Sequence, residues 1–193
     1  YKLFKNNNFR AAAFGYFGHM WELYAFWAFT PLLLSTYAKM YPEVDYNISL
    51  LSFFIIALGG IACVISGYLS QKYPTKNIAV ISLFLSCLCC LLSPIFFQIQ
   101  SELIFILFLM FWGIVVIADS PLFSTLVAQS INAESKGTGL TIVNCIGFAI
   151  TIMSIQLLNT MIDSVNEKYL FMLLAIGPIF GLSSLLKKGR AAI

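Results

Sequence analysis

Charged residues are scarce in this sequence. Only 10% of the 193 residues are Asp, Glu, Lys or Arg, whereas soluble domains carry about 25% charged residues. Hydrophobic residues make up 60% of the chain, and its mean hydropathy is strongly positive. This composition excludes an ordinary soluble domain and indicates a polytopic membrane bundle.

The residue patterns of metal, disulfide and nucleic-acid sites are also missing. With one histidine in the chain, the paired-histidine motifs of metalloproteases cannot occur. The five cysteines lie in apolar runs and lack the paired CxxC spacing of a zinc site, so we expect no metal site, no cofactor and cysteines that act as small apolar residues. No basic patch is interleaved with aromatics, which predicts no nucleic-acid partner. A GxSG serine motif is absent as well, and the chain is therefore predicted not to be an enzyme.

Long apolar runs dominate what remains. A helix needs about 20 apolar residues to cross a bilayer. Polar segments containing Pro, Gly or charged residues separate the runs, and none is long enough to divide the chain into domains. The chain begins with Tyr rather than Met, and we expect it to be a fragment. Residues 1–193 are predicted to form a single six-span bundle, with spans at about 11–38, 49–71, 77–98, 102–127, 138–162 and 168–186.

The basic residues predict the orientation of these spans. In a six-span arrangement only Lys39 and Lys168 fall on one side of the membrane, and the other nine Lys and Arg residues fall on the opposite side. By the positive-inside rule, both termini are cytoplasmic in a multi-pass protein of the cytoplasmic (inner) membrane.

Two carboxylates remain at membrane depth once the loop charges are set aside. Glu22 lies in the first span and Asp119 in the fourth, so each lies in the first helix of a set of three. Each also precedes a helix-disturbing proline, Pro31 or Pro121. Secondary transporters are often built from inverted three-helix repeats with sites on interrupted helices, and this pattern fits that plan.

The first span places its polar groups on one helical face. At about 100° per residue, Gly15, His19, Glu22, Phe26 and Thr30 share that face. Glu22 is either a proton-coupling or substrate-binding carboxylate or the partner of His19 one turn earlier. His19 either shuttles protons or bonds across a helix interface.

Asp119 and the remaining aromatic and polar residues leave similar choices open. Asp119 beside the kink at Pro121 either forms a gate or site or satisfies freed backbone groups. Phe26 is the aromatic residue retained as a cavity candidate, and Trp21 and Trp27 are interpreted as packing. Small and polar residues around Asn144 on the fifth span most often indicate close helix packing.

Two motifs resemble those of the major facilitator superfamily. The segment 67–76, Gly-Tyr-Leu-Ser-Gln-Lys-Tyr-Pro-Thr-Lys, resembles the loop signature G-x-x-x-D-R-x-G-R-K. Gly67, Lys72 and Lys76 fit this signature, whereas Gln71 replaces its acid. Residues 134–139, Glu-Ser-Lys-Gly-Thr-Gly, are similar to the family's E-x-R-G-x-x helix entry. The segments 18–24 and 118–121 are similar to those of bacterial members.

The resemblance implies a fold and a set of roles. The chain would be the carboxy-terminal half of a twelve-helix transporter: an all-α membrane protein whose six transmembrane helices form two inverted three-helix repeats. Its first and fourth helices would line the central cavity. The resemblance thus implies a substrate or proton pathway at Glu22, His19, Asp119, Phe26 and Asn144, and a gating loop and hinge at Gly67, Lys72, Lys76 and Pro121.

We therefore expect a secondary active transporter of a small solute, working by alternating access and coupled to protons through Glu22, Asp119 or both. Its partners would be the lipid bilayer, the missing amino-terminal half and a small-molecule substrate. The two acids disfavour a simple anion as that substrate. The alternative is a non-transporting membrane protein, such as a receptor or assembly subunit, in which both acids are dispensable.

Overall fold

The structure is a computed structural model, and it describes residues 2–187. Every secondary-structure element in this part of the chain is helical. The predicted spans at 102–127 and 168–186 are each built from consecutive helical segments. The elements are η1 (Lys2–Lys5), α1 (Asn7–Met40), α2 (Ile48–Lys72), α3 (Thr75–Gln98), α4 (Glu102–Ala118), α5 (Ser120–Gln129), η2 (Ala133–Ser135), α6 (Lys136–Met161), α7 (Glu167–Leu170), η3 (Phe171–Ala175) and α8 (Ile176–Leu186).

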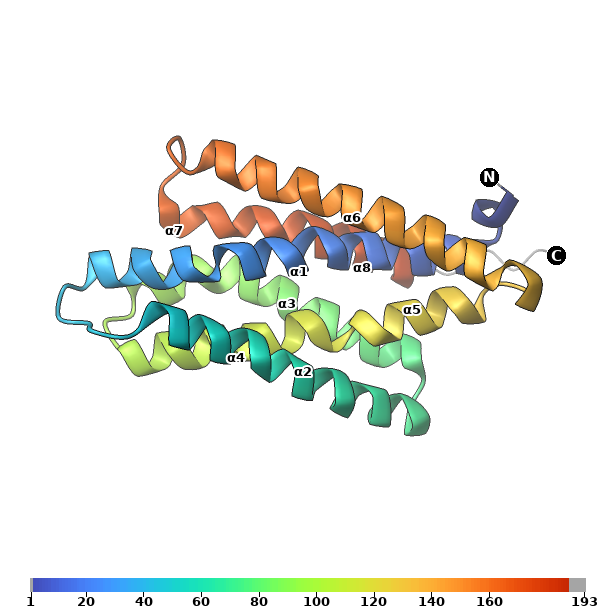
Figure 1. Ribbon diagram of the computed structural model, residues 1–193, viewed down its shortest axis with the longest axis horizontal. Helices are drawn as coiled ribbons and strands as arrows, with labels where there is room; N and C mark the ends of the chain where they lie inside the picture. Colours follow the sequence, from blue (N-terminus) through green and yellow to red (C-terminus); the bar gives the residue numbers. More distant parts are fainter. Residues whose placement is uncertain (1, 188–193) are drawn as a thin grey trace.

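The six predicted spans are confirmed as helical segments, with ends that differ by a few residues. Five of them are long and apolar enough to cross a membrane. The exception is α1, so the expectation that the first span has the same apolar character is wrong. The reason is its position: α1 packs against α6, α8 and α5 and lies among the other helices (Figure 1). Its polar side chains His19, Glu22 and Thr30 are therefore buried within the protein.

Two prolines, expected to act alike, act differently. Pro121 separates α4 from α5, and the break falls at Asp119 as predicted. A proline at 121 cannot donate a hydrogen bond to the carbonyl of Ile117, and the Cys63 thiol from α2 approaches that oxygen at 3.5 Å instead. Pro31 lies inside an unbroken α1, so the predicted interruption of the first span is wrong. Cys63 is likewise more than a small apolar filler.

The closest helix contact joins the first helix to the last. A methyl group on Gly18 of α1 would collide with the backbone carbonyl of Gly177 in α8, and one on Gly177 would lie 2.5 Å from the carbonyl oxygen of Gly18. Gly15 and Gly181 meet one turn further along the same two helices. Small residues at this spacing let two membrane helices approach backbone to backbone, which seats α1 deep in the bundle.

Aromatic packing joins α1, α3 and α4 at the end of the bundle away from the termini. The ring of Tyr37 in α1 stacks on that of Phe105 in α4, with centroids 4.0 Å apart. The Tyr37 hydroxyl donates to the carbonyl of Ile99 at 2.7 Å, and the Tyr41 hydroxyl donates to that of Phe97 at 3.1 Å. These contacts fix the loop ends of α1, α3 and α4 together.

Substituting Gly18 by Ala should lower the thermal unfolding temperature of the purified protein. The added methyl group has no room against a backbone carbonyl, so α1 and α8 must separate, at a cost of about 1–3 kcal/mol. Gly60→Ala on α2 is the matched control, because nothing lies within 4 Å of a methyl group there. Equal unfolding temperatures for the two variants would contradict the close packing of α1 and α8.

Candidate functional site

Glu22 lies near the middle of α1 and is fully buried. Its carboxylate accepts three side-chain hydrogen bonds. Trp112 Nε1 of α4 donates to Oε1 at 2.7 Å, and from α3 the Ser86 hydroxyl donates to Oε2 at 2.8 Å. The Cys90 thiol, also on α3, donates to Oε1 at 3.2 Å. All three partners are donors, and no Lys or Arg takes part.

An aromatic layer covers this carboxylate on one side. The ring of Phe26, one turn after Glu22, contacts the Trp112 ring at a centroid distance of 4.7 Å. Phe108 lies one turn before Trp112, with ring centroids 5.7 Å apart. Phe26 is fully buried, and this packing holds the indole in position to donate to Glu22.

Asp119, and not Glu22, is the carboxylate that contacts His19. His19 Nδ1 of α1 lies 2.9 Å from Asp119 Oδ1, and both side chains are 1% exposed. This contact is an ion pair when the imidazole is protonated. Among the described residues, His19 Nε2 and Asp119 Oδ2 have no hydrogen-bond partner. The alternative in which His19 serves as the structural partner of Glu22 is therefore wrong.

The two acids consequently lie on neighbouring levels of one interface. On α1, His19 precedes Glu22 by one turn. The facing chain is antiparallel, so Trp112 of α4 pairs with Glu22, and Asp119, later in the sequence, pairs with His19. Each acid uses its own partners, yet both lie where α1 meets α4 and α5. Together they form a buried polar seam, which we define as Glu22, Ser86, Cys90, Trp112, His19 and Asp119.

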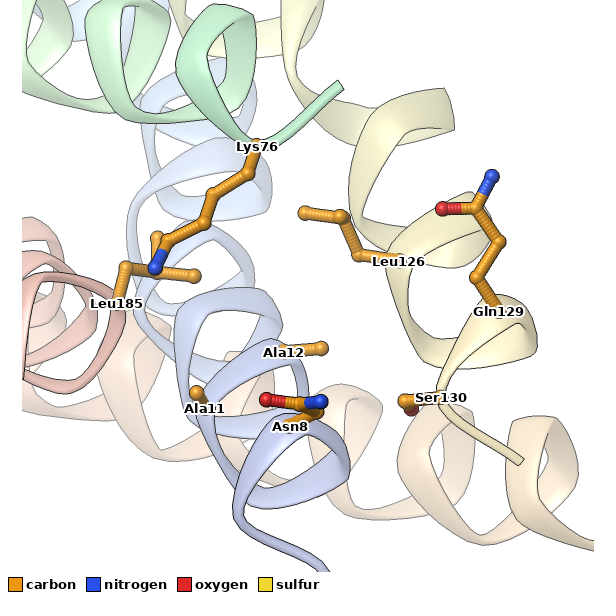
Figure 2. Close-up of a pocket in the computed structure, with 8 residues that line it drawn as sticks. All are labelled: Asn8, Ala11, Ala12, Lys76, Leu126, Gln129, Ser130 and Leu185. Atoms are coloured by element: carbon orange, nitrogen blue, oxygen red, sulfur yellow. The ribbon is translucent and has the colours of Figure 1, made fainter. Parts of the chain in front are cut away.

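A cavity opens at the terminal end of the bundle, on the same side of α1 as His19. It has a volume of about 220 Å³ and lies among α1, α3, α5 and α8. Figure 2 shows Lys76 of α3, Leu126 and Gln129 of α5, Leu185 of α8, and Asn8 and Ala12 of α1 around it.

One apolar layer lies between this cavity and the seam. Leu126 lies one turn beyond Phe123 on α5, and Phe123 lies one turn beyond Asp119. The Phe123 ring lies 5.8 Å from the His19 ring, between centroids. A methyl group on Gly15 would lie 2.5 Å from the Phe123 ring and 3.1 Å from Leu185. Phe123 and Leu185 therefore close the inner end of the cavity at the level of Gly15.

The other predicted site residues lie elsewhere. Asn144 is exposed on α6, and Lys72 is exposed at the end of α2. Gly67 faces open space. Lys76 lines the cavity in Figure 2. No three His, Cys, Asp or Glu side chains of the described residues are placed to hold a metal ion.

The sequence did not identify the three hydrogen-bond donors of Glu22, which are Ser86, Cys90 and Trp112. Ser86 and Cys90 are four residues apart and so share one face of α3, a signal available from the sequence. Trp112 is not among the residues that the sequence analysis singles out, and the cysteines are expected there to act only as small apolar residues. The packing interpretation does hold for Trp21, whose Nε1 donates to the carbonyl of Leu173 at 3.3 Å.

The sequence was compared with protein-family models and with curated proteins. A family model described as Major Facilitator Superfamily matches residues 1–155. The match covers α1 to α5 and most of α6, and thus every residue of the seam. No curated protein matches the chain.

Ser86→Ala should destabilise the protein by about 1–3 kcal/mol, because it leaves one carboxylate oxygen of Glu22 buried without its donor. Ser93→Ala is the matched control on the same helix. Ser93 is equally buried, but its hydroxyl donates only to the carbonyl of Cys90 within α3. Thermal unfolding measures both. A smaller loss for Ser86→Ala than for Ser93→Ala would contradict the role of Ser86 at Glu22.

Proposed function

Because the chain belongs to the Major Facilitator Superfamily, we propose that it forms part of a proton-coupled secondary transporter that moves a small solute by alternating access. The observation that carries this proposal is the seam. Two carboxylates lie fully buried on facing membrane helices, with a single histidine as the only ionisable base beside them. Buried acids at membrane depth are costly, and in membrane proteins they mark proton and substrate pathways.

The two acids have different roles in this proposal. Asp119 and His19 exchange a proton, since the imidazole Nδ1 lies 2.9 Å from a carboxylate oxygen. Glu22 holds α1 against α3 and α4 as long as it is ionised. As a carboxylate it accepts bonds from both α3 and α4, and gaining a proton removes part of its capacity to accept them. Protonation thereby loosens α1 from its neighbours and favours one of two helix arrangements.

The packing supports an inverted repeat of α1–α3 and α4–α8. The first helix of one set, α1, packs against α6 and α8 of the other set. The first helix of the other set, α4, packs against α2 and α3 in return. This reciprocal pattern is what two interlocked three-helix units related by a two-fold axis produce. The break at Asp119 then lies in the helix that corresponds to α1.

Protons reach the seam from the terminal end, which we assign to the cytoplasm from its excess of Lys and Arg. The cavity of Figure 2 brings water to within one apolar layer of His19. Phe123 and Leu185 form the gate in that layer. Movement of α5 about the break at Asp119 would shift Phe123 and connect the cavity to the ion pair.

The rest of the translocation path lies against the amino-terminal half of the transporter. Within their apolar stretches α2 and α6 are the least buried of the spanning helices. On α6, polar side chains alternate with apolar ones along the exposed face, which suits a protein or water interface better than lipid. Those polar residues are Thr141, Asn144, Gln156 and Asn159. We therefore keep Asn144 as a pathway residue and propose a gating role for Gly67 and Lys72, which lie in the last turns of α2.

Replacing Glu22 by Gln or Asp119 by Asn should abolish proton movement coupled to solute. The measurement is fluorescence of a pH-sensitive dye inside proteoliposomes while a panel of amines, sugars and amino acids is added. Each variant loses the titrating group but keeps its shape. Glu43→Gln, an exposed loop acid, is the control and should behave as the unmodified protein. Coupled flux that persists in both seam variants would refute coupling through Glu22 and Asp119, whereas absence of flux in the unmodified protein would favour the non-transporting alternative.

The gate can be tested without knowing the solute, because His19 is the only histidine. Diethyl pyrocarbonate should modify His19 slowly in the unmodified protein and at least several-fold faster in Phe123→Ala and in Leu185→Ala, read by mass spectrometry. Phe105→Ala, an equally buried ring at the end of the bundle away from the termini, is the control. Rates that rise equally in all three variants would indicate general loosening and contradict a gate at this layer.

A further inference from the structure

A second and larger cavity lies beside the first at the terminal end of the bundle. Its volume is about 500 Å³, within the range of about 300–1,000 Å³ typical of ligand pockets. It lies between the starts of α1 and α3 and the end of α8. It shares Asn8, Ala11 and Lys76 with the cavity of Figure 2, but it faces outward past α8 rather than inward toward the seam.

Three cations line this outer cavity, and no carboxylate does. Arg10 comes from α1, Lys76 from the start of α3, and Lys187 follows the end of α8. The Arg10 guanidinium is held in place, because it donates to Asn7 Oδ1 at 2.9 Å and to the carbonyl of Phe4 at 3.5 Å. No described carboxylate forms an ion pair with any of the three. The positive charge is therefore left for an outside anion.

The cavity is polar on one side and aromatic on the other. Phe14 of α1 and Phe180 of α8 line it with their rings 5.4 Å apart. Phe180 is 49% exposed, and Ile179 and Ile176 continue this apolar surface along α8 at 53% and 52% exposed. An occupant thus meets cations at the end of the helices and an apolar surface in the direction of the membrane interior.

From this arrangement we propose that the outer cavity binds the head group of an anionic phospholipid. The phosphate lies against Arg10, Lys76 and Lys187, and one acyl chain follows Phe180, Ile179 and Ile176 along α8. Basic pockets between membrane helices on the cytoplasmic side are suited to such head groups. The starts of α1 and α3 add the partial positive charge of two helix amino-termini near the phosphate. The bound lipid bridges α1, α3 and α8, the helices that surround the gate residue Leu185.

The test compares two variants with the same change in charge. Lys76→Gln/Lys187→Gln removes two cations from the cavity. Lys72→Gln/Lys136→Gln removes two exposed lysines at the same end of the bundle but outside it. Native mass spectrometry counts the phosphatidylglycerol molecules retained as this lipid is titrated into micelles that contain phosphatidylcholine. We expect affinity to fall about fivefold for each cavity lysine removed, since each basic residue contributes comparably to attraction by an anionic surface.

Each outcome decides the proposal. Loss confined to the cavity variant supports it. Equal loss in both variants shows a general attraction of the basic end for anionic lipid and overturns it, as does unchanged binding in both. Displacement of phosphatidylglycerol by inorganic phosphate at equal concentration would make the cavity a site for a soluble phosphate compound and would also overturn the assignment to lipid. Thermal unfolding of both variants in phosphatidylcholine alone verifies that they are folded.

Discussion

A carboxylate in the centre of a membrane bundle has to find hydrogen-bond donors inside the protein, and this constraint organises the fold around Glu22. Its three donors come from two other helices, α3 and α4. Breaking such a network leaves a buried charge without solvation, which costs several kcal/mol. The hydrogen bonds of Glu22 at the middle of α1 therefore fix α1 against α3 and α4, and the glycine contacts fix it against α8. This explains how the least apolar of the six helical segments can occupy the most central place.

The sequence predicted the helices well, because periodic apolar runs and charged loops are local properties. It also singled out Glu22 and Asp119, since a carboxylate inside an apolar run is visible without a structure, and it located the break at Pro121. The partners of the acids were out of reach. His19 is one turn from Glu22, so local spacing favoured that pair, whereas the packing of α5 against α1 brings Asp119 to the imidazole instead. Pro31 and Pro121 look alike in sequence, yet only the second breaks its helix.

The two ends of the bundle on either side of the seam are built differently. At the end away from the termini, Tyr37 packs on Phe105, and a further hollow lies beside Glu167 and Lys168. The terminal end contains the two cavities beside Lys76. One lysine, Lys76, lines both cavities, so an anion bound in the outer one would alter the electrostatic potential at the entrance of the inner one.

The contact between Gly18 and Gly177 has a consequence for biogenesis. Since α8 follows α1 along the chain, the helix that carries His19 and Glu22 is made before Ser86, Trp112 and Asp119 have been translated. Until then these two side chains lack the partners that they have in the folded bundle, and the backbone contact of α1 with α8 forms only when α8 arrives. The bundle therefore acquires the final contacts of α1 through late, long-range closure.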